Sequence, residues 1–257
     1  MELLKLSGKF DKEDYIKLGK FASSWDHSSF INEIKDYFGW IFDKQDMDYI
    51  GLHLQICIKK SRPMYLHGYV ISSALYQYIQ NNNDIEKLTI LETGTARGFA
   101  DIVMAKVLQQ TNKNGIINTI DILGHNNINK WNSIECPNLT KISRYNILNR
   151  WSDLRDNYIN FITGYSNTIL QKLNIGRIHF AFLDGAHKYN ELTNELDFVE
   201  RNQESGDIII CDDYTKKQFP EICKAIDKFL NNKKYIYKFF YGNDGVKKRG
   251  YVFMKKI

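Results

Sequence analysis

The chain has 257 residues, of which 43% are hydrophobic, enough to form one large α/β core or one core with a small helical appendage. Its 35 lysine and arginine residues exceed its 30 acidic residues, and the surplus is spread along the chain with a mild lysine concentration toward the C-terminus. So diffuse a charge argues against nucleic acid as a partner, and no window approaches the roughly 18 apolar residues of a membrane span.

The first part of the chain predicts a helical extension. Its opening segment, Met1–Lys5, lacks the basic start and the apolar stretch of a signal peptide. Apolar and aromatic residues recur at helical spacing through residues 1–45, which predicts one or two helices packed on the main domain. The pattern is irregular over residues 46–65, where we expect a loop or arm, and a helical stripe resumes over residues 65–81. We therefore expect residues 1–80 to be an N-terminal helical extension with an arm.

From residue 81 the chain alternates short apolar strands with helices, which is typical of a parallel sheet with crossover helices. The predicted strands are residues 88–92, 116–121, 160–163, 178–184 and 207–212. The predicted helices lie near residues 98–111, 150–159, 166–173, 188–203 and 219–231. Two further β segments, residues 235–241 and 250–254, flank the turn Gly242–Gly245 and indicate a hairpin with a reversed last strand. Residues 81–257 thus predict one α/β domain with helices on both faces of its sheet.

The four cysteines show no C-x-x-C pair, and Cys211 sits inside an apolar run that suits a small buried side chain. They are typical of free thiols in a reducing compartment. Together with the missing signal peptide, this pattern predicts a cytoplasmic protein.

The first predicted strand runs into a turn that contains two glycines, Gly94 and Gly98. Glycine lets the backbone turn sharply and lets a ligand lie where a Cβ would collide, although an ordinary strand-to-helix turn would account for a lone glycine pair equally well. Glu92 favours the ligand, because a carboxylate at the strand end can bind the ammonium group of an amino-acid cofactor. Asp121 ends the next strand and could accept hydrogen bonds from ribose hydroxyls, or it could simply be solvated.

The segment Glu92–Gly98 resembles the first motif of class I S-adenosylmethionine-dependent methyltransferases, E/D-x-G-x-G-x-G, with Ala96 at the middle glycine. Its glycine spacing is one residue shorter than the G-x-G-x-x-G turn of dinucleotide dehydrogenases. The resemblance implies a Rossmann-like sheet of seven strands with a reversed last strand, and S-adenosylmethionine as cofactor. It implies these cofactor-binding residues: Glu92, Gly94, Thr95, Gly98, Asp121, Tyr165, Ser166 and Asp184.

Two consecutive predicted strands end in acids. Asp184 ends one strand, and Asp212 and Asp213 end the next. The carboxyl ends of neighbouring parallel strands meet at the edge where open α/β sheets bind ligands. Three carboxylates this close repel one another unless a cation compensates them, which favours Mg²⁺ or Mn²⁺ with oxygen ligands. The alternative is that Asp212 and Asp213 form a cap or turn while Asp184 makes a separate hydrogen bond.

The segment Asp184–Tyr189, Asp-Gly-Ala-His-Lys-Tyr, is similar to the D-G-x-H-x-Y signature of the macrocin and mycinamicin sugar O-methyltransferase family. The same pattern occurs in cephalosporin hydroxylase-like relatives, and Lys59–Pro63 resembles a basic, proline-containing segment that precedes the core there. The resemblance covers about residues 50–215. Asp197, on the following helix, either orients a partner or faces solvent.

This second resemblance implies a metal site of Asp184, Asp212 and Asp213 that holds Mg²⁺ or Mn²⁺, with His187 as the base and Asp184 beside it in the catalytic group. The expected reaction is methyl transfer to a hydroxyl of a sugar-containing or similar small polar acceptor, in natural-product or surface-polysaccharide biosynthesis. The sequence is also compatible with a homo-oligomer.

Three other functions are weighed against this expectation. One is a metal-independent methyltransferase that acts on nitrogen or on an already acidic oxygen, with the acids serving only structure. Another is a non-catalytic module that binds S-adenosylmethionine or a sugar nucleotide. A third, an iron or 2-oxoglutarate hydroxylase, is disfavoured because the sequence lacks a suitable 2-His-1-carboxylate spacing.

Overall fold

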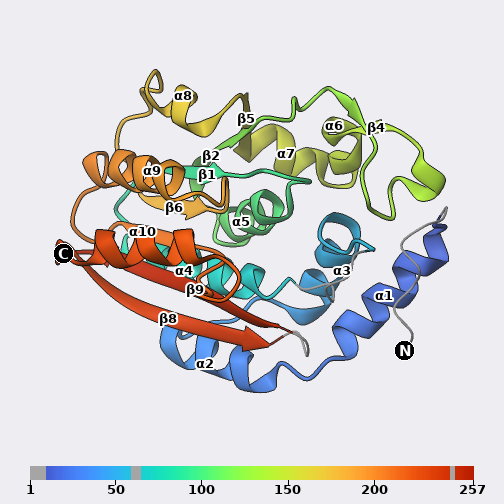
Figure 1. The fold of residues 1–257 in the computed structure, drawn as a ribbon, viewed down its shortest axis with the longest axis horizontal. Coiled ribbons are helices and arrows are strands. Elements are labelled where there is room, and N and C mark those ends of the chain that lie inside the picture. Colours follow the sequence, from blue (N-terminus) through green and yellow to red (C-terminus); the bar gives the residue numbers. More distant parts are fainter. Residues whose placement is uncertain (1–9, 59–64, 244–246) are drawn as a thin grey trace.

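A computed structural model describes residues 10–58, 65–243 and 247–257 (Figure 1). The segment Lys59–Pro63, singled out above as basic and proline-containing, lies outside the described residues, as do Asp244 and Gly245 of the predicted turn before the last strand.

A seven-stranded sheet forms the centre of the molecule, with the order β5-β2-β1-β6-β7-β9-β8. Its first five strands along the chain are parallel to one another, β9 is antiparallel to β7, and β8 and β9 form a hairpin. The prediction of a parallel sheet with a reversed last strand is therefore confirmed. The strands of this sheet are β1 (Lys87–Thr93), β2 (Asn114–Asp121), β5 (Ile159–Thr163), β6 (Phe180–Leu183), β7 (Ile208–Cys211), β8 (Tyr235–Asn243) and β9 (Lys248–Lys256).

Helices cover both faces of the sheet (Figure 1). One face packs on α8, α9 and α10, and the other packs on α2, α4, α5 and α7. The α-helices are α1 (Lys12–Ser24), α2 (Ser28–Phe38), α3 (Lys44–Leu54), α4 (His67–Asn81), α5 (Phe99–Gln110), α6 (Arg144–Ile147), α7 (Ser152–Tyr158), α8 (Ser166–Leu170), α9 (Tyr189–Arg201) and α10 (Pro220–Leu230). Short elements between β2 and α7 are β3 (Ile128–Asn129), η1 (Pro137–Leu139), β4 (Ile142–Ser143) and η2 (Leu148–Trp151).

The N-terminal helices α1 to α4 share one hydrophobic core with α5 and with one face of the sheet. The predicted domain boundary near residue 80 falls at the end of α4, and the division into two domains stays a prediction. Among the described residues, no helix combines the length and the apolar character that crossing a membrane would require. All four cysteines are free thiols, as the sequence predicted.

The prediction of a loop or arm over residues 46–65 is wrong for its first half, which lies in helix α3. Asp43 caps this helix by accepting a hydrogen bond from the Asp46 N–H at 2.9 Å. Gly51 weakens the helical pattern in the sequence. Position 51 nevertheless requires glycine, since a Cβ there would stand 2.7 Å from the Tyr65 ring. Met47 and Ile50 on the same helix are buried in the core.

Candidate active site at the carboxyl edge of the sheet

Strand β1 leads into a turn with a left-handed backbone at Gly94, Ala96 and Gly98, where φ is 94°, 47° and 90°. A Cβ on Gly94 would stand 2.1 Å from the backbone carbonyl oxygen of Asp184, a distance that no side chain can occupy. The predicted need for glycine is thus explained by the loop after β6 as well as by a ligand. Gly98 caps the N-terminus of α5, whose backbone N–H groups face this turn and favour an anionic or polar ligand.

Glu92 lies beneath the turn with only 1% of its surface exposed. Its Oε2 accepts a hydrogen bond from Thr119 Oγ1 at 2.5 Å, and the Thr119 and Thr95 hydroxyls lie 2.6 Å apart. Burial and the neighbouring carboxyl of Asp101 raise the pKa of Glu92 well above its ordinary value. The structure therefore holds Glu92 and Thr95 in one buried network, while binding of the cofactor ammonium by Glu92 stays a prediction.

Asp121 lies at the end of β2 and hydrogen-bonds both the glycine turn after β1 and the loop after β2. Its Oδ2 accepts the Ala96 N–H at 2.7 Å and its Oδ1 accepts the Leu123 N–H at 2.8 Å. Arg144, only 1% exposed, places Nη2 3.1 Å from Oδ2 and donates Nε to the Ala96 carbonyl at 2.7 Å. Sequence reasoning missed Arg144, because it lies in a stretch without periodic pattern. Each carboxylate oxygen accepts more than one hydrogen bond, so these contacts leave room for ribose hydroxyls at Asp121.

Tyr165 and Ser166 follow β5, as the sequence predicted. The Tyr165 side chain is 71% exposed and free to stack on a flat ligand. The Ser166 hydroxyl instead lies against the buried carboxyl of Glu195, whose pKa it helps to lower. The structure thus points Ser166 toward α9, and contact of either residue with adenine stays a prediction.

Asp184, His187 and Asp213 come together after β6 and β7, each offering one ligand atom within 4.8 Å of the others. His187 Nε2 lies 2.8 Å from Asp213 Oδ2 and 3.9 Å from Asp184 Oδ1. Asp212 lines the same small pocket, but its Oδ1 accepts the Asp213 N–H at 2.6 Å. Helix α9 begins at Tyr189, so His187 lies in the loop before that helix.

The acids of this cluster are held in an unfavourable electrostatic environment. Burial, with Asp213 as the next contributor, raises the pKa of Asp212 to about 7. Burial, followed by Asp212 and Asp213, raises the pKa of Asp184 well above its ordinary value. Ionising several buried carboxyls with raised pKa values at once costs electrostatic free energy. A cation bound between them would remove that cost.

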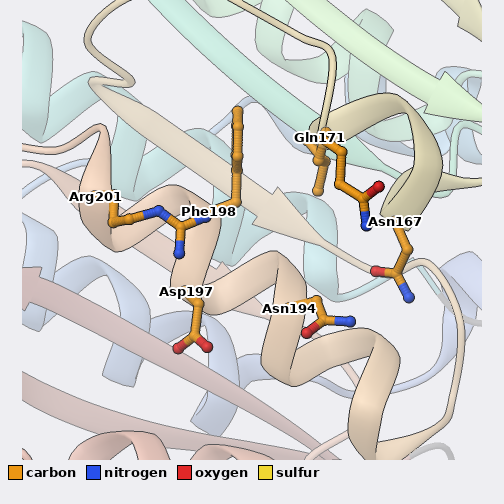
Figure 2. Close-up of a pocket in the computed structure, with 7 residues that line it drawn as sticks. Asn167, Gln171, Asn194, Asp197, Phe198 and Arg201 are labelled. Carbon is orange, nitrogen blue, oxygen red and sulfur yellow. The ribbon is translucent and has the colours of Figure 1, made fainter.

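Asp197 lies apart from this cluster. It lines a pocket of about 180 Å³ between α8 and α9 with other polar side chains, and Figure 2 shows Asp197 projecting from α9 among them. These residues are Asn167, Gln171, Asn194 and Arg201. Asp197 is exposed and belongs to neither the glycine turn nor the acidic cluster.

The hydrogen bond to Asp213 raises the pKa of His187 above 6.5. In the metal-free protein we expect NMR to show His187 titrating above pH 6.5, and Asp213→Asn to bring that pKa back toward 6.5. Because the folded pKa is raised, the ion pair stabilises the fold fully below pH 6.5, and its contribution is lost as the pH rises through the raised pKa. His179 is the internal reference, since burial lowers its pKa. Titration of His187 at or below 6.5 in the unmodified protein would contradict this pairing.

Residues 91–214 match the model of a family described as a methyltransferase domain. This match, the sheet with its reversed last strand and the glycine turn after β1 define the class of protein. Residues 91–214 are thus a methyltransferase domain of the S-adenosylmethionine-dependent class. No curated protein sequence matches it significantly.

Solved structures of O-methyltransferases share the fold. The O-methyltransferase from Bacillus cereus in complex with SAH aligns with a TM-score of 0.57 at 11% identity, over 96% of this chain and 100% of that one. TomG from Streptomyces achromogenes, involved in tomaymycin synthesis and bound to SAM, aligns with a TM-score of 0.56 at 12% identity, over 90% and 99%. The O-methyltransferase NovP aligns with a TM-score of 0.54 at 18% identity, over 74% and 79%. At these identities the likeness concerns the fold.

Proposed function

We propose that this enzyme transfers the methyl group of S-adenosylmethionine to a hydroxyl oxygen of a sugar-containing or similar small polar acceptor, with Mg²⁺ or Mn²⁺ bound at the acidic cluster. The observation that carries the proposal is the convergence of Asp184, His187 and Asp213 within 4.8 Å. This cluster adjoins the glycine turn after β1, residues 94–98, which we call the cofactor turn. The two are in contact because Gly94 packs directly on the Asp184 backbone. Oxygen as the acceptor atom is supported by the O-methyltransferase activity named for the structural neighbours, and a sugar by the D-G-x-H-x-Y signature.

The donor set fits a hard divalent cation. Carboxylate oxygens are the ligands that Mg²⁺ prefers, and Mn²⁺ accepts both carboxylate and imidazole. Asp184 and Asp213 would be the primary ligands. Asp212 would contribute Oδ2, because its Oδ1 is already engaged by the Asp213 N–H. The raised pKa values of Asp184 and Asp212 agree with a site built to hold positive charge.

The cofactor carries its own good leaving group, so the protein mainly has to align and activate the acceptor. When bound, the cation supplies positive charge that lowers the pKa of an acceptor hydroxyl. His187 accepts the hydroxyl proton at Nδ1, the ring nitrogen that Asp213 does not engage, while Asp213 accepts the Nε2–H, orients the imidazole and stabilises its protonated form. The turn at Gly94 and Asp121 at the end of β2 would hold the cofactor.

The proposal is tested by methyl transfer from labelled S-adenosylmethionine to a panel of sugars, glycosides and vicinal diols, with and without a chelator. We expect transfer to at least one hydroxyl acceptor, its loss after metal removal, and its recovery when Mg²⁺ or Mn²⁺ is restored. Matched amines serve as the control acceptors. Full transfer in the chelator, or transfer to the amines alone, would instead identify a metal-independent enzyme and refute the proposed metal role.

A further inference from the structure

Glu195 is a carboxyl placed where an apolar residue is expected. It lies on α9 between Leu192 and Leu196, on the face that packs against the sheet, and only 1% of its surface is exposed. Burying a carboxyl costs free energy unless it finds partners. Burial raises the pKa of Glu195 to about 7, so the desolvation is only partly offset by its neighbours. Neither the metal nor the cofactor role proposed above uses this residue.

The partners of Glu195 come from two other parts of the site. Thr93, the last residue of β1, donates its hydroxyl to Glu195 Oε2 at 2.9 Å. Ser166, the first residue of α8, is close enough to the same carboxyl to lower its pKa, while Glu195 Oε1 has no hydrogen-bond partner among the described residues. One side chain on α9 therefore joins the strand that enters the cofactor turn to the loop that follows β5.

The loop that carries Asp184 packs against Glu195 and Thr93. A Cβ on Gly185 would stand 3.1 Å from Glu195 Oε1 and 3.1 Å from Thr93 Oγ1, so the glycine backbone lies directly against both side chains. The Thr93 carbonyl also accepts the Asp184 N–H at 3.0 Å. The position of Asp184 thus depends on Thr93, and the Thr93 side chain is fixed by Glu195.

We propose that Glu195 is a positioning residue. It fixes the positions of the cofactor turn after β1, the loop after β5 and the Asp184 loop relative to one another. It acts through Thr93, Ser166 and Gly185 and touches none of the reacting groups. The metal half of this inference rests on the proposed function. The cofactor half rests only on the methyltransferase assignment.

The test compares three variants of the full chain. Glu195→Leu removes every polar contact of the carboxyl, whereas Glu195→Gln keeps an oxygen to accept the Thr93 hydroxyl. Gln203→Leu is the matched control, because Gln203 is also buried but bonds the Ile208 carbonyl and Tyr235 near the opposite end of α9. Binding of SAH is measured by calorimetry and binding of Mn²⁺ by electron paramagnetic resonance, so neither readout needs a known acceptor. Thermal unfolding reports stability.

We expect Glu195→Leu to weaken both SAH and Mn²⁺ binding by roughly tenfold while the protein stays folded, because supporting partners of a site typically matter at this scale. Glu195→Gln should bind both probes within about threefold of the unmodified protein, since the key hydrogen bond survives. Gln203→Leu should change stability but neither affinity.

The outcomes separate this inference from the proposed function. Unchanged SAH affinity in a folded Glu195→Leu variant overturns the inference, and so does equal loss of SAH affinity in Gln203→Leu. Where Glu195→Leu does not fold, failure of Glu195→Gln to retain affinity overturns it too. If the unmodified protein binds SAH but no Mn²⁺, the proposed metal site fails, while the SAH comparison still decides the role of Glu195.

Discussion

Replacement of Asp213 by asparagine should lower kcat by about a thousandfold, the loss expected when a cation worth several kcal/mol of charge stabilisation is no longer held. The same change removes the carboxylate that faces His187 Nε2 at 2.8 Å, so the proposed base also loses its orientation. The fold should tolerate the change, because Asp213 has φ of 61° and asparagine adopts this left-handed conformation as readily as aspartate. Steady-state kinetics with saturating metal and calorimetry with SAH measure the two effects.

SAH affinity should fall little in Asp213→Asn, because the cofactor turn and Asp121 are untouched. Asp197→Asn is the matched control, since it makes the same chemical change on α9 away from the cluster, and it should leave kcat unchanged. Asp213→Asn with near-normal kcat would show that the cluster serves structure, which is the alternative that the sequence left open.

Replacement of Gly94 by alanine should destabilise the protein by about 3 kcal/mol and abolish measurable SAH binding. A Cβ at this position would stand 2.1 Å from the Asp184 carbonyl oxygen, so β1 and the Asp184 loop must separate. The left-handed φ of 94° adds strain for any residue with a Cβ. Urea unfolding measures the stability and calorimetry the affinity.

Gly176→Ala isolates the backbone part of this effect. Gly176 also has a positive φ, of 68°, but a Cβ there would meet nothing within 4 Å. We expect this control to cost about 1–2 kcal/mol from conformation alone and to bind SAH normally. Equal losses of stability in the two variants would mean that the close contact between the turn and the Asp184 loop does not matter.

The sheet could be predicted from the sequence because its buried strands are continuous apolar runs that end at charged or glycine residues. The run that ends at Asp212 is an example, since β7 occupies Ile208–Cys211 within a predicted strand of residues 207–212. The glycine turn after β1 was also predicted, as a place where the backbone is closely approached. The neighbour found there, the Asp184 backbone, comes from a strand distant in sequence and leaves no local trace.

Other parts of the site could not be predicted for identifiable reasons. Arg144 reaches back to Asp121 from a segment with no helical or strand period, and only the folded chain brings the two together. The left-handed conformation of Asp213, which turns its carboxylate toward His187, is not encoded by residue type. Glu195 did carry a signal, because it stands within the helical stripe of Leu192 and Leu196 where an apolar residue is normal.

The proposed function requires a divalent cation between the loops after β6 and β7, beside the cofactor. Anomalous diffraction from a crystal grown with SAH and Mn²⁺ tests this most directly. We expect a single manganese peak within ligand distance of the Asp184 and Asp213 carboxylates. A clear SAH molecule with no manganese peak at these residues would contradict it.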